Sequence, residues 1–585
     1  MRWASQRKWL IAGLAVLLLT GLALALRSRR LTEVSMVKPT RTLPPQTAIL
    51  ASPTLTPTPT ATPTATETPT PTPTPTPAGG GGSIVYAWDG DLVAVDVTTR
   101  QVARLTFDPD PERDPALSPD GRHLAFSARR EANWDLYRLD LGNGSVVRLT
   151  EQPDYDGHPS WSPDGDVIAF ETLRGGDLDI YLLPAEGGEA RPLVDSPAAE
   201  TSPSWSPDGR WLVYSAHVAG QRDLYLIPLA GGEPVNLTDS PDQHEDEPAF
   251  SPDGRELAYS VGLGGERMLY VAPIDLTAGR LITASARLVG TGAGPAWSPD
   301  GGSLVAHAPS RRSPRIQVIE TAGFNRSLLT FQADLPFGGP AWGQERLPQT
   351  AIERARTAPP TPEPTPLYVE VVAPTPTAPP YYSFVRLPVR TNGPYLSDRV
   401  DDSFRALRQR VIDETGYDYL SVFGDMWRGI DAYARPGQSD RSWHKAGRAF
   451  DINQGPYGQG QDVVIVLETF GGRVFWRVYF RTARQDGTQG EPLRVAPWNW
   501  SAQPGPDRAP TGGAPSLVIP SGYWLDFTAL AAEYGWHSVA ALRRWRTYYP
   551  DMDWWHFQKT DGLSWVEAMR EVYPEEEIEG VFGLR

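Results

Sequence analysis

The 585-residue chain contains no cysteine and only eight histidines. The absence of cysteine excludes disulfide bonds, thiolate metal sites and a cysteine nucleophile, so any metal site must be built from histidine and carboxylate side chains. Basic residues are also in deficit, because 54 Lys and Arg face 70 Asp and Glu. The resulting net charge of −16 argues against a nucleic-acid partner, whose binding would require a basic face.

Long apolar runs are scarce, and the one exception lies at the start of the chain. Residues 9–26 are uncharged and apolar, with basic residues on both sides. A helix of this length spans about 27 Å, close to the thickness of the hydrocarbon core of a bilayer. We therefore expect residues 1–30 to be a signal anchor, and the protein to be a single-pass protein of the cell membrane with its globular parts extracytoplasmic. A small-residue pattern at 23–25 leaves cleavage and secretion open.

Two segments rich in proline and threonine divide the rest of the chain. Residues 31–82 contain nearly pure Thr-Pro alternation followed by four glycines, and residues 347–380 form a second such segment. Sequences of this kind bury no core and favour extended polyproline II, so we expect a stalk and a linker. Globular domains are predicted at 83–346 and 381–585.

The first globular block contains an internal repeat. Variants of the pentapeptide Leu-Ser-Pro-Asp-Gly begin at Leu117, Trp161, Trp205, Phe250 and Trp297, with spacings of 44, 44, 45 and 47 residues. Ser-Pro-Asp-Gly suits a type I turn, and each copy precedes short segments of alternating apolar residues. Four short strands in each repeat of this length are typical of a propeller blade.

Six blades are expected when the segment at 84–86, before the first turn, is counted with those that follow the turns. An incomplete copy of the repeated motif at 341–343 would complete the first sheet and close the ring. The turns and blades resemble the TolB-type, WD-like β-propeller family, which implies an unidentified protein or glycan ligand on a face of the disc. The repeated tryptophans are expected to pack between blades, and each turn aspartate to accept local hydrogen bonds.

The second block holds eleven of the twenty tryptophans and three of the eight histidines. One stretch, 442–452, places His444 and Asp451 seven residues apart, with Gly447 between them. The alternation after Gly447 predicts a strand on which Asp451 faces away from the core. A turn at Gly447 would return His444 to the same side, where both side chains could reach one cation.

A second stretch, 551–557, supplies His556 with Asp553 three residues before it. Zinc hydrolases need three protein ligands, an open coordination position and a nearby base that is not a ligand. His444, Asp451 and His556 would be the ligands, and Asp553 would be the catalytic base.

These two motifs resemble those of the zinc D,D-carboxypeptidase and L-alanyl-D-glutamate endopeptidase family, which cuts the stem peptides of peptidoglycan. The resemblance covers about residues 398–558, including a short amphipathic helix expected at 404–411. It implies a Zn²⁺ cofactor, peptidoglycan stem peptides as substrates, and Arg428 as the residue that holds a substrate carboxylate. A structural salt bridge is the alternative for Arg428, and Ser442 would order its loop or donate to the substrate. An aspartate as base favours the endopeptidase branch without deciding it.

An insertion at 459–520 departs from that family's pattern. Apolar segments at 463–467 and 474–480 flank two glycines and predict a hairpin, followed by a loop rich in proline and glycine. The insertion could line a groove, restrict the substrate, or be decoration. His537 matches neither motif and is expected to be a surface or packed histidine.

These features together predict a multidomain protein with an N-terminal transmembrane helix, a six-bladed all-β propeller and a C-terminal α+β zinc peptidase-like domain. Its predicted function is the zinc-dependent hydrolysis of amide bonds in peptidoglycan stem peptides. One competing hypothesis is a non-catalytic cell-wall or protein-binding module with a structural metal site. A third makes the propeller the functional part and the last domain a wall anchor.

Overall fold

The computed structural model describes residues 32–36 and 78–583, apart from internal gaps. The predicted signal anchor and most of the predicted stalk lie outside these residues. Within the described ranges, no helix has both the length and the apolar character needed to cross a bilayer. The gaps are at 242, 263, 265, 309, 311–314, 325–326, 333–338, 359–365, 373–379, 434–438, 453–461 and 503–511.

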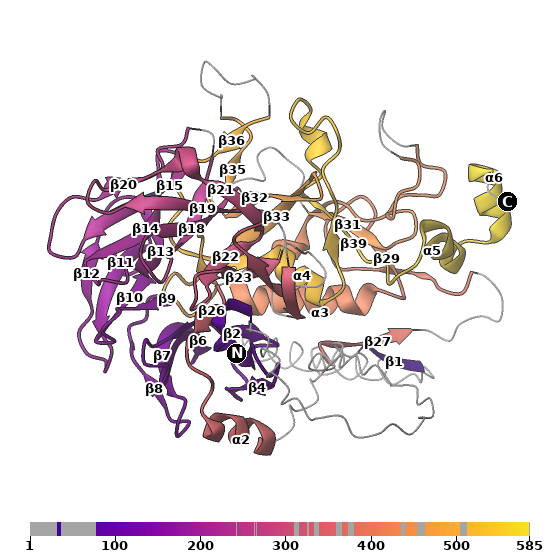
Figure 1. The fold of residues 1–585 in the computed structure, drawn as a ribbon. Helices are drawn as coiled ribbons and strands as arrows, with labels where there is room; N and C mark the ends of the chain where they lie inside the picture. The colour runs from indigo at the N-terminus through magenta and orange to yellow at the C-terminus, as the bar shows by residue number, and fades with distance from the viewer. Residues whose placement is uncertain are drawn as a thin grey trace, which may run out of the picture.

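Six antiparallel sheets make up the first half of the molecule, drawn in indigo and magenta in Figure 1. The first-named strands of all six sheets line one shared cavity of about 470 Å³, so they surround a central channel. With the strand that lines the channel named first, the first two sheets are β26 (Ala341–Gly343), β2 (Ser83–Trp88), β3 (Asp91–Asp96), β4 (Val102–Arg104) and β5 (Glu112–Leu117), β6 (His123–Arg130), β7 (Asn133–Asp140), β8 (Val146–Arg148). The next two are β9 (Asp156–Trp161), β10 (Val167–Thr172), β11 (Asp179–Pro184), β12 (Arg191–Val194) and β13 (Ala199–Trp205), β14 (Trp211–Val218), β15 (Gln221–Pro228), β16 (Val235–Asn236). The last two are β17 (Glu245–Phe250), β18 (Glu256–Val261), β19 (Met268–Asp275), β20 (Arg280–Leu281), with β21 (Arg287–Thr291) also paired with β19, and β22 (Ala293–Trp297), β23 (Ser303–Ala308), β24 (Arg315–Glu320), β25 (Ser327–Gln332).

The ring closes as the sequence predicts, because β26 pairs with β2 and places Trp342 opposite Ile84. This late strand completes the first sheet, so the first and last blades share the same β-structure.

The repeated turns have the predicted chemistry. In the first copy, Gly121 N–H donates to Ser118 O at 2.9 Å, and the Ser118 hydroxyl donates to Asp120 Oδ1 at 2.6 Å. The tryptophan that opens the next copy, Trp161, donates from Nε1 to Ala116 O on the preceding blade at 2.9 Å. The aspartate is thus a local acceptor and the tryptophan joins neighbouring blades, as expected.

The segment 347–380, predicted as a linker, is partly structured. Helix α2 (Gln349–Thr357) lies within it and buries Ala351 against the first two blades. Arg354 at its end donates to Leu141 O at 3.2 Å. Composition indicated only an extended chain here, whereas a few apolar residues are enough to dock one short helix on an existing core.

The C-terminal half contains two four-stranded sheets and four helices, with buried aromatic side chains between them. Its longest helix, α3, buries Phe404, Leu407 and Val411, which confirms the predicted amphipathic helix. The Phe404 ring lies 5.3 Å from the ring of Phe450 in the first sheet. The sheets are β30 (Phe423–Asp425), β31 (Ala449–Ile452), β39 (His556–Gln558), β38 (His537–Ser538) and β32 (Val463–Phe470), β33 (Arg473–Arg481), β37 (Tyr523–Asp526), β34 (Glu491–Pro492); the helices are α3 (Asp401–Thr415), α4 (Phe527–Glu533), α5 (Trp565–Val572) and α6 (Glu575–Phe582).

Short elements complete the described chain. Among the described residues there are also three two-stranded pairs and four 3₁₀ turns. They are β1 (Thr32–Met36) with β27 (Tyr368–Val372), β28 (Phe384–Arg386) with β29 (Tyr395–Ser397), β35 (Trp498–Asn499) with β36 (Ala514–Pro515), and η1 (Ala78–Gly80), η2 (Thr283–Ser285), η3 (Tyr419–Ser421) and η4 (Tyr549–Met552).

The two halves contact each other through the insertion of the C-terminal domain. Arg494, just after β34, donates to Glu171 Oε2 at 2.9 Å and to the Ser202 hydroxyl at 3.2 Å, both on the propeller. Just after the insertion, the Tyr523 hydroxyl accepts from Tyr155 N–H at 2.9 Å. The insertion therefore packs against one end of the propeller channel, and it is not decoration.

Candidate metal centre

Two neighbouring strands set the first two members of the predicted site side by side. β31 and β39 are antiparallel, and Asp451 is the direct register partner of His556. Side chains at paired positions lie on the same face of a sheet, so this register brings together residues more than one hundred positions apart. Phe450 and Ile452, the neighbours of Asp451, are buried in the hydrophobic core, as the alternation predicts.

His444 reaches the same place through the predicted turn. Gly447 has φ +63°, and a Cβ there would lie 2.7 Å from Ser397 N and from the Phe384 ring. Only glycine fits this close approach and left-handed conformation, so the turn that returns His444 to Asp451 depends on Gly447.

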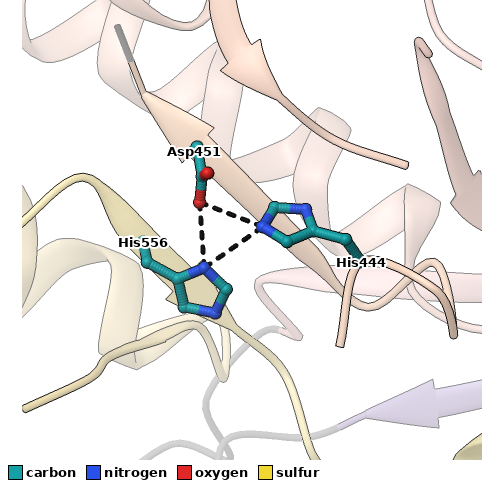
Figure 2. Close-up of side chains that lie close together, drawn as sticks. All are labelled: His444, Asp451 and His556. Atoms are coloured by element: carbon teal, nitrogen blue, oxygen red, sulfur yellow. Dashed lines mark hydrogen bonds and ion pairs between the residues drawn. The ribbon is translucent and has the colours of Figure 1, made fainter. Parts of the chain in front are cut away.

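The three side chains converge on one point, as Figure 2 shows. Asp451 Oδ1 lies 3.0 Å from His444 Nε2 and 2.9 Å from His556 Nδ1, and the two ring nitrogens are 3.2 Å apart. One ligand atom from each residue thus faces a common centre. Sequence reasoning predicted this convergence.

The outer nitrogen of each imidazole has its own partner, which sets the tautomer. His444 Nδ1 lies 3.1 Å from Met426 O, and a carbonyl only accepts, so Nδ1 carries the proton and Nε2 faces the centre. His556 Nε2 lies 3.3 Å from Gln558 Oε1, which leaves Nδ1 for the centre. Such outer hydrogen bonds orient metal-binding histidines.

Electrostatics at the centre favour a cation. Burial opposes ionisation of Asp451, but His444 and His556 outweigh it and hold the pKa of that carboxyl well below its usual range. Burial also opposes protonation of His556, yet its bond to Asp451 raises the pKa of the imidazole to about 9. A proton therefore occupies the centre near neutral pH, in the position where a divalent cation would replace it.

The centre forms part of the lining of a pocket of about 300 Å³. Asp553 lines the same pocket in a left-handed conformation, with φ +51°. Burial raises the pKa of Asp553 above its ordinary value, and the neighbouring Asp451 adds to this, while His556 opposes it. The structure therefore places the predicted base beside the predicted ligands.

Arg428 and Ser442 also line the pocket. Arg428 Nη2 lies 3.9 Å from Asp451 Oδ2, and its Nε is bonded to Asp425. Both interpretations of Arg428 thus have support, because it is paired within its own loop and faces the pocket. The Ser442 hydroxyl accepts from His444 N–H at 3.4 Å, which agrees with a role in ordering the loop.

Sequence reasoning missed two further cations of the pocket, Arg441 and Arg473. Arg441 lies three residues before His444, and Arg473 follows the turn of the predicted hairpin. The composition of the insertion gave no sign of where its strands would point. His537 lies on β38, outside the pocket lining, and is exposed, as expected.

A second group of acidic side chains lies away from this pocket. Glu370, Asp401 and Asp402 offer oxygen atoms within 4.8 Å of one another. Within the described residues, neither Glu370 oxygen has a hydrogen-bond partner, and Glu370 is 2% exposed. Burial raises the pKa of Glu370 to about 8, so this carboxyl is protonated at neutral pH.

Replacing Glu370 with glutamine should stabilise the protein at pH 8 but not at pH 5. The folded pKa of Glu370 lies above the ordinary value of 4.5, so the wild-type protein loses stability as the pH rises from about 4.5 to about 8. Glutamine stays neutral, and the expected gain at pH 8 is on the order of 1–3 kcal/mol. Thermal unfolding at both pH values measures this, with the exposed Glu576→Gln as control; an equal change at both pH values would contradict it.

Comparison with known proteins identifies the first half. A family model described as the TolB beta propeller domain matches residues 87–196 and 195–344. Residues 87–344 form a TolB-type β-propeller. The match to this propeller family ends before every residue of the candidate metal centre. Among curated proteins, none matches the chain.

Solved structures similar to the TolB-type propeller share little sequence with it. TolB from Acinetobacter baumannii is 20% identical over 45% of this chain and 66% of its own, with a TM-score of 0.38. A putative TolB from Agrobacterium tumefaciens is 23% identical over 46% of this chain and 96% of its own, with a TM-score of 0.36. An oligogalacturonate lyase in complex with manganese is 19% identical over 41% and 74%, with a TM-score of 0.31.

Proposed function

We propose that this protein is a membrane-tethered, extracytoplasmic zinc-dependent peptidase that hydrolyses amide bonds of peptidoglycan stem peptides. The observation that carries the proposal is the convergence of His444, Asp451 and His556 beside Asp553 in one pocket. The motifs that these residues form resemble those of the zinc D,D-carboxypeptidase and L-alanyl-D-glutamate endopeptidase family.

The donor set fits zinc. Two imidazole nitrogens and one carboxylate oxygen are a known ligand set for a catalytic zinc ion, and the pocket leaves one side of the centre open. Both imidazoles are oriented by outer hydrogen bonds, and Asp451 is buried and ionised. When bound, the ion would supply Lewis-acid polarisation of the scissile carbonyl and lower the pKa of a water ligand.

The remaining steps belong to side chains of the chain itself. Asp553 would accept a proton from the attacking water and pass it to the leaving amine, and its raised pKa suits both transfers. Arg428 would orient the peptide through a carboxylate, since a guanidinium binds carboxylates through two parallel hydrogen bonds. Ser442 would keep the His444 loop in place.

The other parts of the chain would set where this chemistry happens. The expected anchor at 1–30 and stalk at 31–82 would hold the catalytic domain outside the membrane, within reach of the cell wall. The TolB-type propeller would bind a protein or glycan ligand at its free face.

The test is the zinc content of the full-length protein together with its products on purified muropeptides. We expect about one zinc per chain by elemental analysis, in line with one three-ligand centre. Mass spectrometry should show either loss of a terminal D-alanine or cleavage between L-alanine and D-glutamate, which distinguishes the two branches. A protein that binds zinc and sacculi but leaves every muropeptide intact would instead be the non-catalytic module.

A further inference from the structure

We propose that Arg473 binds a carboxylate of the substrate, and that the TolB-type propeller holds it in position for this role. The inference rests on the proposed function and adds to it a second carboxylate-binding residue besides Arg428, contributed by the insertion and not by the two motifs. It also makes the propeller a part of substrate recognition in the peptidase pocket.

Arg473 lies at the end of a tight hairpin. Strands β32 and β33 pair along their full length, and the last pair joins Phe470 to Arg473. The two residues between them, Gly471 and Gly472, have φ values of +55° and +69°, as a type I′ turn requires. This turn fixes the direction of the Arg473 backbone relative to both strands.

The propeller forms hydrogen bonds with the same turn. Glu266 N–H donates to Thr469 O at 2.7 Å, and the Glu266 carboxylate accepts from Gly471 N–H at 2.8 Å. A Cβ on the neighbouring Gly264 would lie 2.5 Å from Leu467 O, so the two backbones are in direct contact. The hairpin end that carries Arg473 is thus held from both sides, by its own sheet and by the propeller.

The positive charge of the arginines that line the pocket favours an anionic ligand. Arg428, Arg441 and Arg473 line it, and among the described residues neither Arg441 nor Arg473 forms an ion pair. Of the carboxylates that line the pocket among the described residues, Asp451 is bonded to both histidines, and Asp553 is the base of the proposed reaction. Arg428 has its own partner in Asp425.

Arg473 is exposed to solvent and lines the pocket, and its charge has no ionic partner among the described residues. Its guanidinium lies 5.8 Å from the Phe475 ring, a contact that orients the side chain but does not neutralise it. A guanidinium that lines a concave site and has no counter-ion among the described residues is suited to a carboxylate, through charge-assisted hydrogen bonds in a fork geometry.

The experiment compares two matched stem peptides, one with a free carboxylate beside the scissile amide and one with that group amidated. For wild type we expect a lower KM on the acid. Arg473→Gln should raise KM for the acid about tenfold, the usual worth of a charge-assisted hydrogen bond, with kcat and the amide kinetics unchanged. Arg473→Lys should restore part of the lower KM for the acid relative to the amide.

The variant Glu266→Ala tests the role of the propeller in positioning Arg473. Glu266→Ala should weaken the preference for the acid in the same direction and by a smaller factor, since it frees the hairpin but keeps Arg473. The controls are Arg484→Gln, an exposed arginine of the same domain, and Glu233→Ala, an exposed glutamate of the propeller. Equal KM values for acid and amide in wild type, or an unchanged preference in Arg473→Gln, would overturn the inference and leave the peptidase proposal intact.

Failure of the peptidase proposal would look different. If wild type cleaves neither peptide, calorimetric binding of both peptides to the zinc-loaded protein decides the inference by itself. A preference for the acid that Arg473→Gln abolishes upholds it, whereas equal or absent binding overturns it.

Discussion

Replacing Asp553 with asparagine should leave the zinc content unchanged and lower kcat/KM on stem peptides by at least about a hundredfold. Asparagine keeps the size of the side chain but cannot accept the proton, and general-base catalysis is worth about 10² to 10⁴ in rate. Asp553 lines the pocket but is not one of the three converging ligands. Elemental analysis and peptide turnover on the same preparation test both halves of this expectation.

His556→Ala is the matched contrast, because it should lose zinc and turnover together. It removes one ligand atom and leaves Asp451 buried with a single histidine partner. His537→Ala, on the neighbouring strand β38 and exposed, should retain both zinc and activity. An Asp553→Asn protein with wild-type turnover would remove the assigned base, and a His556→Ala protein with full zinc would remove the assigned ligand.

The propeller could be predicted because its information is local and repeated. Each Ser-Pro-Asp-Gly copy defines its own turn, through the hydrogen bond from Gly121 N–H to Ser118 O and its equivalents. Five copies at nearly constant spacing, counted together with the segment at 84–86 before the first copy, then give six sheets. Closure by β26 followed from an incomplete first blade and a leftover strand motif at the end.

The convergence of His444, Asp451 and His556 was predictable for a different reason. Alternation fixed the face of Asp451, and Gly447 marked the turn that brings His444 back. The pairing of Asp451 with His556 is a long-range register, which neither stretch specifies alone. The requirement for a third ligand, together with the resemblance of both motifs to one peptidase family, connected them.

Contacts between the domains could not be predicted. Arg494 and Glu266 are ordinary charged residues in sequence, and their importance depends on which surfaces meet. From the sequence, the insertion could line a groove, restrict the substrate or be decoration. In the structure it contributes Arg473 to the pocket lining and Arg494 to the contact with the propeller. The docking of α2 was missed because its segment is dominated by residues that favour extended chain.

Replacing Arg494 with methionine should make the two domains unfold separately and should lower the free energy of unfolding by about 3 kcal/mol. The Arg494 side chain is 22% exposed, and its partner Glu171 is completely buried. Asp114 and Asp246, also buried, attract the same guanidinium. Asp114 and Asp246 keep ion-pair partners in Arg113 and Arg222, but removal of Arg494 leaves the buried Glu171 carboxylate without a counter-charge, which is the costly case for buried ion pairs. Calorimetry should show two transitions where the wild type shows one, whereas the exposed Arg543→Met should behave like wild type.

The double variant Arg494→Met with Glu171→Gln decides whether charge is the cause. Glutamine still accepts from the Tyr155 hydroxyl, which lies 3.0 Å from Glu171 Oε1, but it carries no charge that requires Arg494. When both members of a buried pair become neutral, most of the loss should be recovered, because the penalty comes from the unpaired ion. Losses that simply add in the double variant would show instead that Arg494 acts through packing. Recovery would mean that the propeller recognises this arginine by its charge, so the buried Glu171 carboxylate keeps the C-terminal domain in contact with the propeller.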